Sequence, residues 1–295
     1  MIRRPPRSTL SSSSAASDVY KRQTIDLIKF DEITKNLPMI VDLKPSGTGY
    51  MEDLYKAGGS QRIFYELKDF LYLDAKSVNG TTLGEEIKNS AKWTQNIITD
   101  KSNPVFNAGS IAVLKGTLAP NSAIIKQSAA TQSLLIHEGR AVVFEGLEDL
   151  ANRIDRDDLD VTKDDVLVLK SIGPKGGPGM PEAGLIPIPK KLAKQGVKDM
   201  VRISDGRMSG TASGTIILHV TPESYENGPL AIVENGDLIK LDVPKRKIDL
   251  MISEEEIAER LLKRKELSIR RRGYNKIYME HVTQADRGVD FDFLI

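Results

Sequence analysis

The chain has 295 residues, a length that fits one large domain or two of ordinary size. Hydrophobic residues make up 40% and charged residues 28%, which is typical of a soluble globular protein and excludes an intrinsically disordered chain. No apolar run reaches the roughly 18–20 residues that span a bilayer. Cysteine is absent, which excludes disulfides, thiolate nucleophiles and a cysteine-ligated cluster within this chain.

The first 23 residues differ in composition from the rest. They contain two adjacent prolines, five basic residues and a serine run that stands where a signal peptide would need its apolar core. An Arg- and Ser-rich transit peptide is the alternative interpretation, but the segment resembles translated sequencing-adapter read-through, and we expect residues 1–23 to be non-native or disordered. Five basic residues against Asp18 give this segment +4, so the formal total of +1 leaves 1 − 4 = −3 for the remainder. A mildly acidic body argues against a nucleic-acid or anionic-membrane partner.

Residues 25 to about 93 have a mainly helical pattern. A helix is expected over Met51–Ala57, because it runs into Gly58-Gly59, which is a typical stop signal. A second helix is expected between Arg62 and Leu71, where apolar residues recur on one helical face.

From about Asn103 the pattern changes to short apolar runs of strand length, separated by turn residues. The expected strands are Ile111–Leu114, Ala123–Lys126, Arg140–Phe144, Val166–Lys170, Val201–Ser204, Thr215–Val220, Leu230–Val233 and Leu238–Val243. Asn235-Gly236 predicts a hairpin turn between the last two. Helices are expected over Leu147–Arg153 and Ser253–Lys265, and Ser253 has the capping-box spacing to Glu256. Many short strands with few helices indicate a barrel or a sheet curled on itself.

Two glycine-rich segments could carry chemistry, and the first is Gly173–Glu182. Its glycines and prolines would let the backbone approach a ligand closely, and the carboxylate at its end could bind a hard cation such as Mg²⁺. An ordinary surface loop is the alternative. A phosphate-binding P-loop is a poor match, because no Gly-Lys-Ser/Thr follows.

The second segment, Ser204–Gly214, concentrates hydroxyls and glycines between two expected strands. Its glycines could expose a serine hydroxyl, and nearby amide groups could stabilise an alkoxide or bind an anion. An ordinary polar turn is the alternative. The elbow motif of hydrolases is not present, since Gly206 stands three residues before Ser209 rather than two. We interpret Asp205 and Arg207 as residues that orient this loop.

The three histidines, His137, His219 and His281, are scattered along the chain. None has the spacing of metal ligands. We therefore expect all three to be structural.

Taken together, these segments resemble the dihydroxy-acid dehydratase and phosphogluconate dehydratase family, often called IlvD/Edd. The matching stretches follow the family's order and cover essentially everything after residue 24: Asp42–Gly47, Met51–Gly59, Gly116–Pro120, Gly173–Glu182, Ser204–Gly210 and His219–Ser224. Further stretches resemble the sugar-acid branch, which acts on pentonates such as arabinonate or xylonate: Met208–Thr211, Ile188–Leu192, His281–Asp286 and Asp290–Leu294. Gly206 and Ser213 depart from that branch, which often has alanine and an aromatic residue there, so the exact substrate stays open.

The resemblance implies an α/β (α+β) fold. Residues 96–295 would form a swivelling β-barrel-like C-terminal domain with flanking helices, and residues 24–95 the helical end of an N-terminal α/β domain. It also implies a cytoplasmic homo-oligomer, a dimer or tetramer, that acts on a small-molecule sugar acid and has neither nucleic acid nor membrane as a partner.

The family reaction removes water from a 2,3-dihydroxy acid to give a 2-keto-3-deoxy acid, which needs a base for the C2 proton and a Lewis acid for the leaving hydroxyl. By resemblance, Glu182 is a magnesium ligand, Ser209 is the base that acts as an alkoxide, and Thr211 lines the same pocket. The implied cofactors are Mg²⁺ and an iron–sulfur cluster, whose cysteine ligands lie in the half that precedes this chain.

We therefore expect the chain to be a C-terminal fragment of a hydro-lyase, without dehydratase activity of its own. One alternative is the dihydroxy-acid dehydratase of branched-chain amino-acid biosynthesis. Another, from a different functional class, is a cluster-free module that binds a small anion in the same glycine-rich pocket.

Overall fold

The computed structural model describes residues 26–88, 90, 95–264 and 272–294. The described residues divide into two compact units: residues 26–31 together with those from Ile111 onward form the first, and those between Glu32 and Ser110 form the second. The segment expected to be non-native, residues 1–23, lies outside the described residues. The domain boundary expected after residue 95 stays a prediction.

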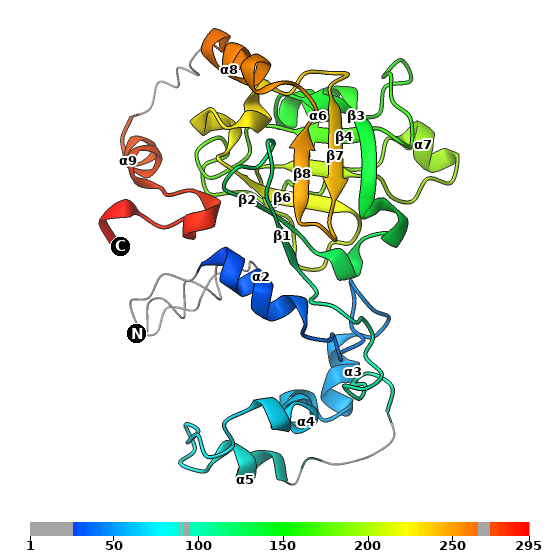
Figure 1. Ribbon diagram of the computed structural model, residues 1–295, viewed down its shortest axis with the longest axis vertical. Coiled ribbons are helices and arrows are strands. Elements are labelled where there is room, and N and C mark those ends of the chain that lie inside the picture. Colours follow the sequence, from blue (N-terminus) through cyan, green and yellow to red (C-terminus); the bar gives the residue numbers. More distant parts are fainter. Residues whose placement is uncertain (1–25, 89, 91–94, 265–271, 295) are drawn as a thin grey trace. The chain divides into compact units, whose positions relative to one another are not determined.

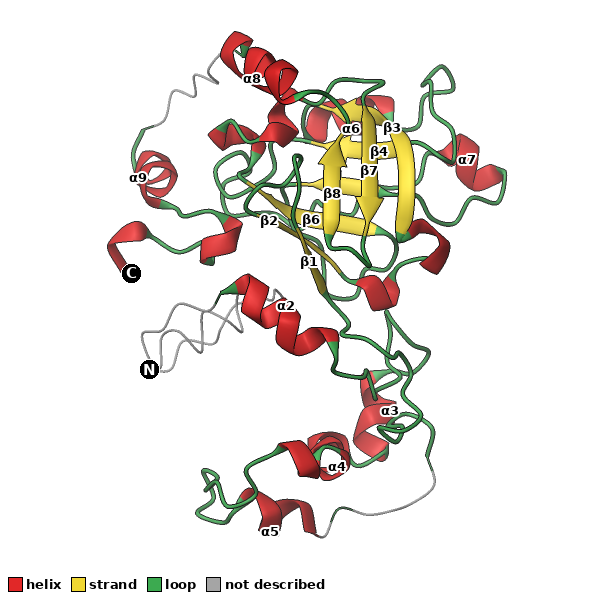
Figure 2. Cartoon of the chain, viewed as in Figure 1, coloured by secondary structure: helices red, strands yellow, loops and turns green. Residues whose placement is uncertain are grey.

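The first unit is built on an eight-stranded sheet that curls into a nearly closed barrel (Figure 1, Figure 2). In the order in which they pair, its strands are β1 (Ala112–Leu114), β2 (Ser122–Ile125), β6 (Ile216–Thr221), β5 (Arg202–Ser204), β4 (Val166–Leu169), β3 (Ile136–Phe144), β7 (Leu238–Asp242) and β8 (Lys247–Leu250). Lys115, which follows β1, donates its amide to Arg246 and accepts from Ile248, so the two edge strands approach each other. The expected α/β, barrel-like fold is confirmed.

Strands β3, β4, β5 and β6 run parallel to one another, and the other pairings are antiparallel. Helix α6 (Leu147–Arg153) connects β3 to β4, α7 (Lys190–Lys194) lies between β4 and β5, and an irregular loop connects β5 to β6. The carboxyl ends of the four parallel strands therefore lie at one edge of the sheet. In open α/β sheets such edges are where ligands bind.

Alternation along the strands explains how both faces of the sheet are buried. Val143 and Val168 belong to the cluster that fills the barrel, whereas Val142 and Leu167 belong to a second cluster with residues of α6 and α7. Successive side chains of a strand point to opposite faces. A strand covered on both faces is consequently apolar throughout, as β4 is, with all four of its residues buried.

Two sequence expectations about this unit are wrong. Leu230–Val233 is not a strand, because Pro229–Ile232 forms a 3₁₀ helix whose apolar side chains fill the barrel core. Consequently Asn235-Gly236 does not connect two strands, and β7 pairs instead with β8, a strand that the sequence analysis missed. A run of four apolar residues fits a buried turn of helix as well as a strand.

The structure contains six further α-helices within the described residues. Their bounds are α2 (Leu27–Lys35), α3 (Met51–Lys56), α4 (Gly59–Glu66), α5 (Leu83–Lys88), α8 (Glu254–Lys263) and α9 (Tyr274–His281). The 3₁₀ helices are Lys68–Phe70, Gln127–Ala129, Gln132–Leu134, Ser224–Glu226, Pro229–Ile232, Ala285–Arg287 and Asp292–Leu294. The expected N-cap of α8 is confirmed, since the Ser253 hydroxyl accepts a hydrogen bond from the Glu256 amide at 3.1 Å.

The second unit contains α3, α4 and α5 and has a small core of Ile40, Ala57 and Ile98, against which residues of α3 and α4 pack. The expected helix over Met51–Ala57 is confirmed as α3. The helix expected from Arg62 to Leu71 is interrupted, because α4 ends at Glu66 and a short 3₁₀ helix follows. In the part of the chain that the structure describes, no helix combines the length and apolar character needed to cross a membrane.

Candidate active site

Three loops leave the carboxyl edge of the parallel strands. The glycine-rich loop, Gly173–Glu182, follows β4; the serine loop, residues 205–214, follows β5; and Pro222–Ser224 follow β6. All three carry polar groups whose partners lie on a neighbouring loop. This is the edge at which the sheet topology favours a binding site.

Arg207 holds the glycine-rich loop and the serine loop together. Its Nη1 lies 3.1 Å from Glu182 Oε1, and its Nε donates to the Met180 carbonyl at 2.5 Å. Its own carbonyl accepts from the Gly184 amide at 2.7 Å. The two loops that sequence analysis selected are therefore in contact, and the Glu182 carboxylate, 43% exposed, has a guanidinium as its counter-ion.

The serine loop presents two hydroxyls on its outer side. Met208 and Ala212 pack against residues of β6 in a small apolar cluster, and this contact fixes the face that the loop turns inward. Ser209 and Thr211 lie between these two buried residues, and their hydroxyl oxygens are 3.1 Å apart. Thr211 is exposed and Ser209 is partly exposed. Both hydroxyls are thus within reach of a bound molecule.

A lysine that sequence analysis did not select also contacts the serine loop. Lys126 lies directly after β2, and its Nζ donates to the Gly210 carbonyl at 2.7 Å, between the two hydroxyl residues. Burial lowers the pKa of Lys126. Among the ion pairs of the described residues, none involves this lysine. Its charge can therefore act on the loop or on a bound anion.

Asp205, in the serine loop, connects the segment that precedes the glycine-rich loop to the segment that follows β6. Its carboxylate is fully buried and accepts hydrogen bonds from the amides of Ile172 at 2.9 Å, Ser171 at 3.3 Å and Ser224 at 2.9 Å. Burial raises the pKa of Asp205, and the three amide donors oppose that rise. These contacts give Asp205 the orienting role that the sequence suggested.

Glu223 is a second buried carboxylate, and it holds the glycine-rich loop. It accepts from the amides of Lys175 and Gly176, each at 2.9 Å, and from Gln284 Nε2 at 2.6 Å. Burial raises the pKa of Glu223 against these donors. A Cβ at Gly173 would lie 2.6 Å from Glu223 Oε2, so only glycine fits there. The sequence placed Glu223 in a family-like stretch but gave no indication of this role.

His219 lies in β6 beside the serine loop. The register between β2 and β6 shifts at this point, and His219 adopts a φ of 53°, as a bulged residue does. Its amide donates to the Gly206 carbonyl at 3.1 Å. Burial, with a smaller contribution from the Arg207 charge, lowers the pKa of His219 to about 4, so the ring is neutral at physiological pH. This environment fits the structural role expected for it.

The donor set of the described residues fits magnesium only in part. The Glu182 carboxylate is an oxygen ligand of the kind that Mg²⁺ prefers. However, no group of three or more His, Asp or Glu side chains within the described ranges is gathered to hold a metal ion, so further ligands would have to come from elsewhere. The iron–sulfur cluster that the resemblance implies does not fit this chain, because the chain contains no cysteine to ligate it.

Comparison with known sequences identifies the family. The profile of the dihydroxy-acid/6-phosphogluconate dehydratase C-terminal domain matches residues 96–289, and that of the N-terminal domain matches residues 14–86. The chain belongs to this family. The match covers the barrel, the loops at its edge and most of the second unit.

Curated relatives agree with this membership. An L-arabinonate dehydratase of Rhizobium leguminosarum bv. trifolii (strain WSM2304) is 44% identical over 92% of this chain and 47% of its own length. A 6-deoxy-6-sulfo-D-gluconate dehydratase of Pseudomonas putida is 40% identical over 94% of this chain and 49% of its own length. A dihydroxy-acid dehydratase of Carboxydothermus hydrogenoformans (strain ATCC BAA-161 / DSM 6008 / Z-2901) is 41% identical over 90% of this chain and 48% of its own length. The chain spans about half the length of the curated relatives it matches.

Proposed function

We propose that the protein containing this chain is a hydro-lyase that dehydrates a 2,3-dihydroxy sugar acid, such as a pentonate, to a 2-keto-3-deoxy acid. The observation that best supports this proposal is the contact that Arg207 makes between the glycine-rich loop and the serine loop. This contact brings the Glu182 carboxylate and the loop that carries the Ser209 and Thr211 hydroxyls to the same edge of the sheet. The similarity to an L-arabinonate dehydratase favours a sugar acid as the substrate.

Ser209 is the residue we propose as the base for the C2 proton. A serine hydroxyl rarely ionises at neutral pH, so it needs nearby positive charge to stabilise its alkoxide. Lys126 donates to the Gly210 carbonyl of the serine loop, and Arg207 belongs to that loop, so both would supply positive charge near Ser209. Thr211, whose oxygen lies 3.1 Å from that of Ser209, would donate a hydrogen bond to the alkoxide or to the substrate.

Glu182 is the residue we propose for magnesium. The bound ion would supply Lewis-acid activation of the substrate's carboxylate and 2-hydroxyl. Glu182 would contribute one oxygen ligand, for which it would exchange its contact with Arg207. The iron–sulfur cluster would need cysteines from outside this sequence. We therefore propose that the 295-residue chain has no dehydratase activity by itself.

The test compares this chain with the full-length protein in anaerobic, cluster-reconstituted assays on arabinonate and xylonate. The full-length protein should turn over one of them, and the isolated chain neither. Ser209→Ala in the full-length protein should lower kcat by about 100-fold or more, as loss of a general base does. Ser133→Ala, at an exposed serine outside the three loops, is the matched control and should keep full activity. Turnover by the isolated chain, or an active Ser209→Ala variant, would refute the assignment.

A branched-chain dihydroxy-acid dehydratase is the second candidate. The relative with that activity is 41% identical and the L-arabinonate dehydratase 44%, a difference too small to separate the substrates. Adding a branched-chain 2,3-dihydroxy acid to the same assay decides between them. A higher kcat/KM for the branched acid than for either pentonate would favour the second candidate.

A further inference from the structure

The C-terminal tail, defined here as Tyr274–Asp292, contacts the glycine-rich loop at two places. The Tyr278 hydroxyl, on α9, accepts a hydrogen bond from the Gly179 amide at 3.1 Å. Gln284 reaches the other part of the loop indirectly, through the Glu223 carboxylate that holds the amides of Lys175 and Gly176. The tail thus acts on both halves of the loop that ends in the candidate magnesium ligand.

The contact between Gln284 and Glu223 uses both ends of the Gln284 amide. Its Nε2 donates to Glu223 Oε1 at 2.6 Å, and its Oε1 accepts from the Glu223 backbone amide at 2.9 Å. Glu223 is fully buried, and a buried carboxylate is costly unless donors surround it. Gln284 is the side-chain donor in this set, so it contributes to keeping the carboxylate charged and in place under the loop.

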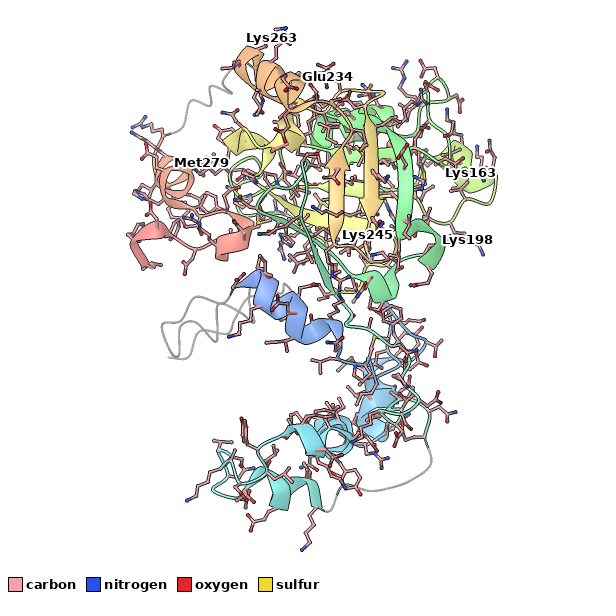
Figure 3. The ribbon with its side chains drawn as sticks, viewed as in Figure 1. Lys163, Lys198, Glu234, Lys245, Lys263 and Met279 are labelled. Atoms are coloured by element: carbon pink, nitrogen blue, oxygen red, sulfur yellow. The ribbon has the colours of Figure 1, made fainter. Side chains whose placement is uncertain are left out.

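The tail has its own internal structure, which lets it act as a support. Thr283 and Asp290 exchange hydrogen bonds: the Thr283 amide donates to the Asp290 carbonyl, and the Asp290 amide donates to the Thr283 hydroxyl. The Phe291 ring packs edge-on against Tyr278 at 5.9 Å between centroids. Met279, marked in Figure 3, is the buried residue of α9.

The glycine-rich loop, by contrast, has few hydrogen bonds of its own. Two turns stabilise it internally, in which the Gly177 amide donates to Gly173 and the Met180 amide donates to Gly177. A segment rich in glycine loses much conformational entropy when it is ordered, so external contacts are needed to hold one conformation. Three of its other amides, at residues 175, 176 and 179, donate to Glu223 or Tyr278.

We infer that the C-terminal tail is a clamp that positions the glycine-rich loop, with Tyr278 and Gln284 as its positioning residues. The inference rests on the proposed function in one respect: the loop matters for catalysis only if Glu182 binds the cation. The clamp sets where Glu182 stands relative to the serine loop, although neither tail residue contacts either hydroxyl residue in the described contacts.

The experiment measures amide exchange residue by residue, by NMR, in the folded 295-residue chain. Tyr278→Phe removes one hydroxyl and should raise exchange at Gly179 by up to about tenfold, which is the effect of losing one hydrogen bond. Gln284→Met keeps the side-chain length but removes both polar groups, and should raise exchange at Lys175 and Gly176 by a similar factor. Amides of β4 and β6 should keep their rates in both variants.

Matched controls separate a clamp from a general loss of stability. Tyr274→Phe changes an exposed tyrosine on the same helix, and Gln195→Met changes an exposed glutamine away from the tail; neither should alter exchange in the loop. Unchanged loop amides in both Tyr278→Phe and Gln284→Met would overturn the inference. An equal rise in the loop and in the barrel strands would also overturn it, since the tail would then support the whole unit.

A second measurement connects the clamp to catalysis in the full-length protein. Both variants should need several-fold more MgCl₂ for half-maximal activity, with kcat largely restored at saturating MgCl₂. A residue with only a structural role would lower activity at every MgCl₂ concentration alike, which would count against a positioning role. The exchange result does not depend on turnover, so a wrong enzymatic assignment would leave the full-length protein inactive while the loop amides still respond.

Discussion

At His219, burial and backbone conformation act together on one side chain. The residue stands at a bulge with positive φ, and its ring is neutral because burial lowers its pKa from 6.5 to about 4. A group whose pKa is depressed by folding contributes stability that is present above its unfolded pKa. That contribution is lost as the pH falls from about 6.5 toward 4, because the unfolded chain then binds a proton that the folded chain does not. The limit of this loss is about 3 kcal/mol.

We therefore expect His219→Gln to flatten the dependence of unfolding free energy on pH between 7 and 4. Urea unfolding of the two proteins across this range measures it, and the difference between their curves isolates the histidine. The comparison is needed because burial raises the pKa values of Asp205 and Glu223. Their contribution to the unfolding free energy increases as the pH falls, whereas that of His219 decreases. Parallel curves for the two proteins would contradict a neutral His219 in the folded chain.

Helix α8 shows how one element depends on its first residue. Ser253 caps it through the Glu256 amide, while Ile257 and Leu261 pack against the barrel core and Arg260 pairs with Asp237 at 2.6 Å. Because α8 packs on the barrel core, interactions that stabilise the helix also raise the unfolding free energy of the barrel unit. The cap satisfies one of the amides that no helical carbonyl can reach.

Ser253→Ala should lower the unfolding free energy of the barrel unit by about 1 kcal/mol, and Ser253→Asp should retain most of it, because aspartate is an equally good N-cap. Urea unfolding of the three proteins at pH 7 provides the measurement. If alanine and aspartate were equally destabilising, something other than the cap hydrogen bond would be responsible.

Elements with a strong local pattern were predictable from the sequence. Val166–Leu169 has an uninterrupted apolar pattern, and Ser253 with Glu256 has a cap signal, so β4 and α8 followed directly from the residues. Leu230–Val233 has the same apolar character as a strand, but Pro229 and tertiary packing turn it into a 3₁₀ helix. The short strand β8 was missed because its apolar residues alternate with charged ones over only four positions.

At the scale of the molecule, the site depends on which strands are neighbours. The family resemblance implied that Glu182, Ser209 and Thr211 share one pocket, and the parallel order of β4, β5 and β6 brings their loops to one edge of the sheet. The supporting residues could not be predicted, because a lone glutamate or glutamine has no local signal. Glu223 and Gln284 lie 61 residues apart in the sequence and meet only in the folded chain.

The two compact units should differ in stability. Among the described residues, the largest cluster of the barrel unit contains 23 buried residues and that of the second unit three, with Tyr55, Tyr72 and Val78 exposed. A domain that buries little apolar surface gains little free energy to offset its conformational entropy. We therefore expect residues 32–110 to unfold at a lower temperature than the barrel, so calorimetry should show two transitions.

Two core substitutions test whether the transitions belong to these units. Ile98→Ala should lower the midpoint temperature of the first transition only, and Val168→Ala that of the second only. Each substitution should reduce the unfolding free energy of its own unit by about 1–3 kcal/mol, because it removes part of a buried side chain. Brief digestion with thermolysin should cut within residues 32–110 first and leave the barrel intact, because local opening exposes the backbone of the less stable unit. A single transition that both substitutions shift would show that the second unit is stabilised by the barrel and not by its own small core.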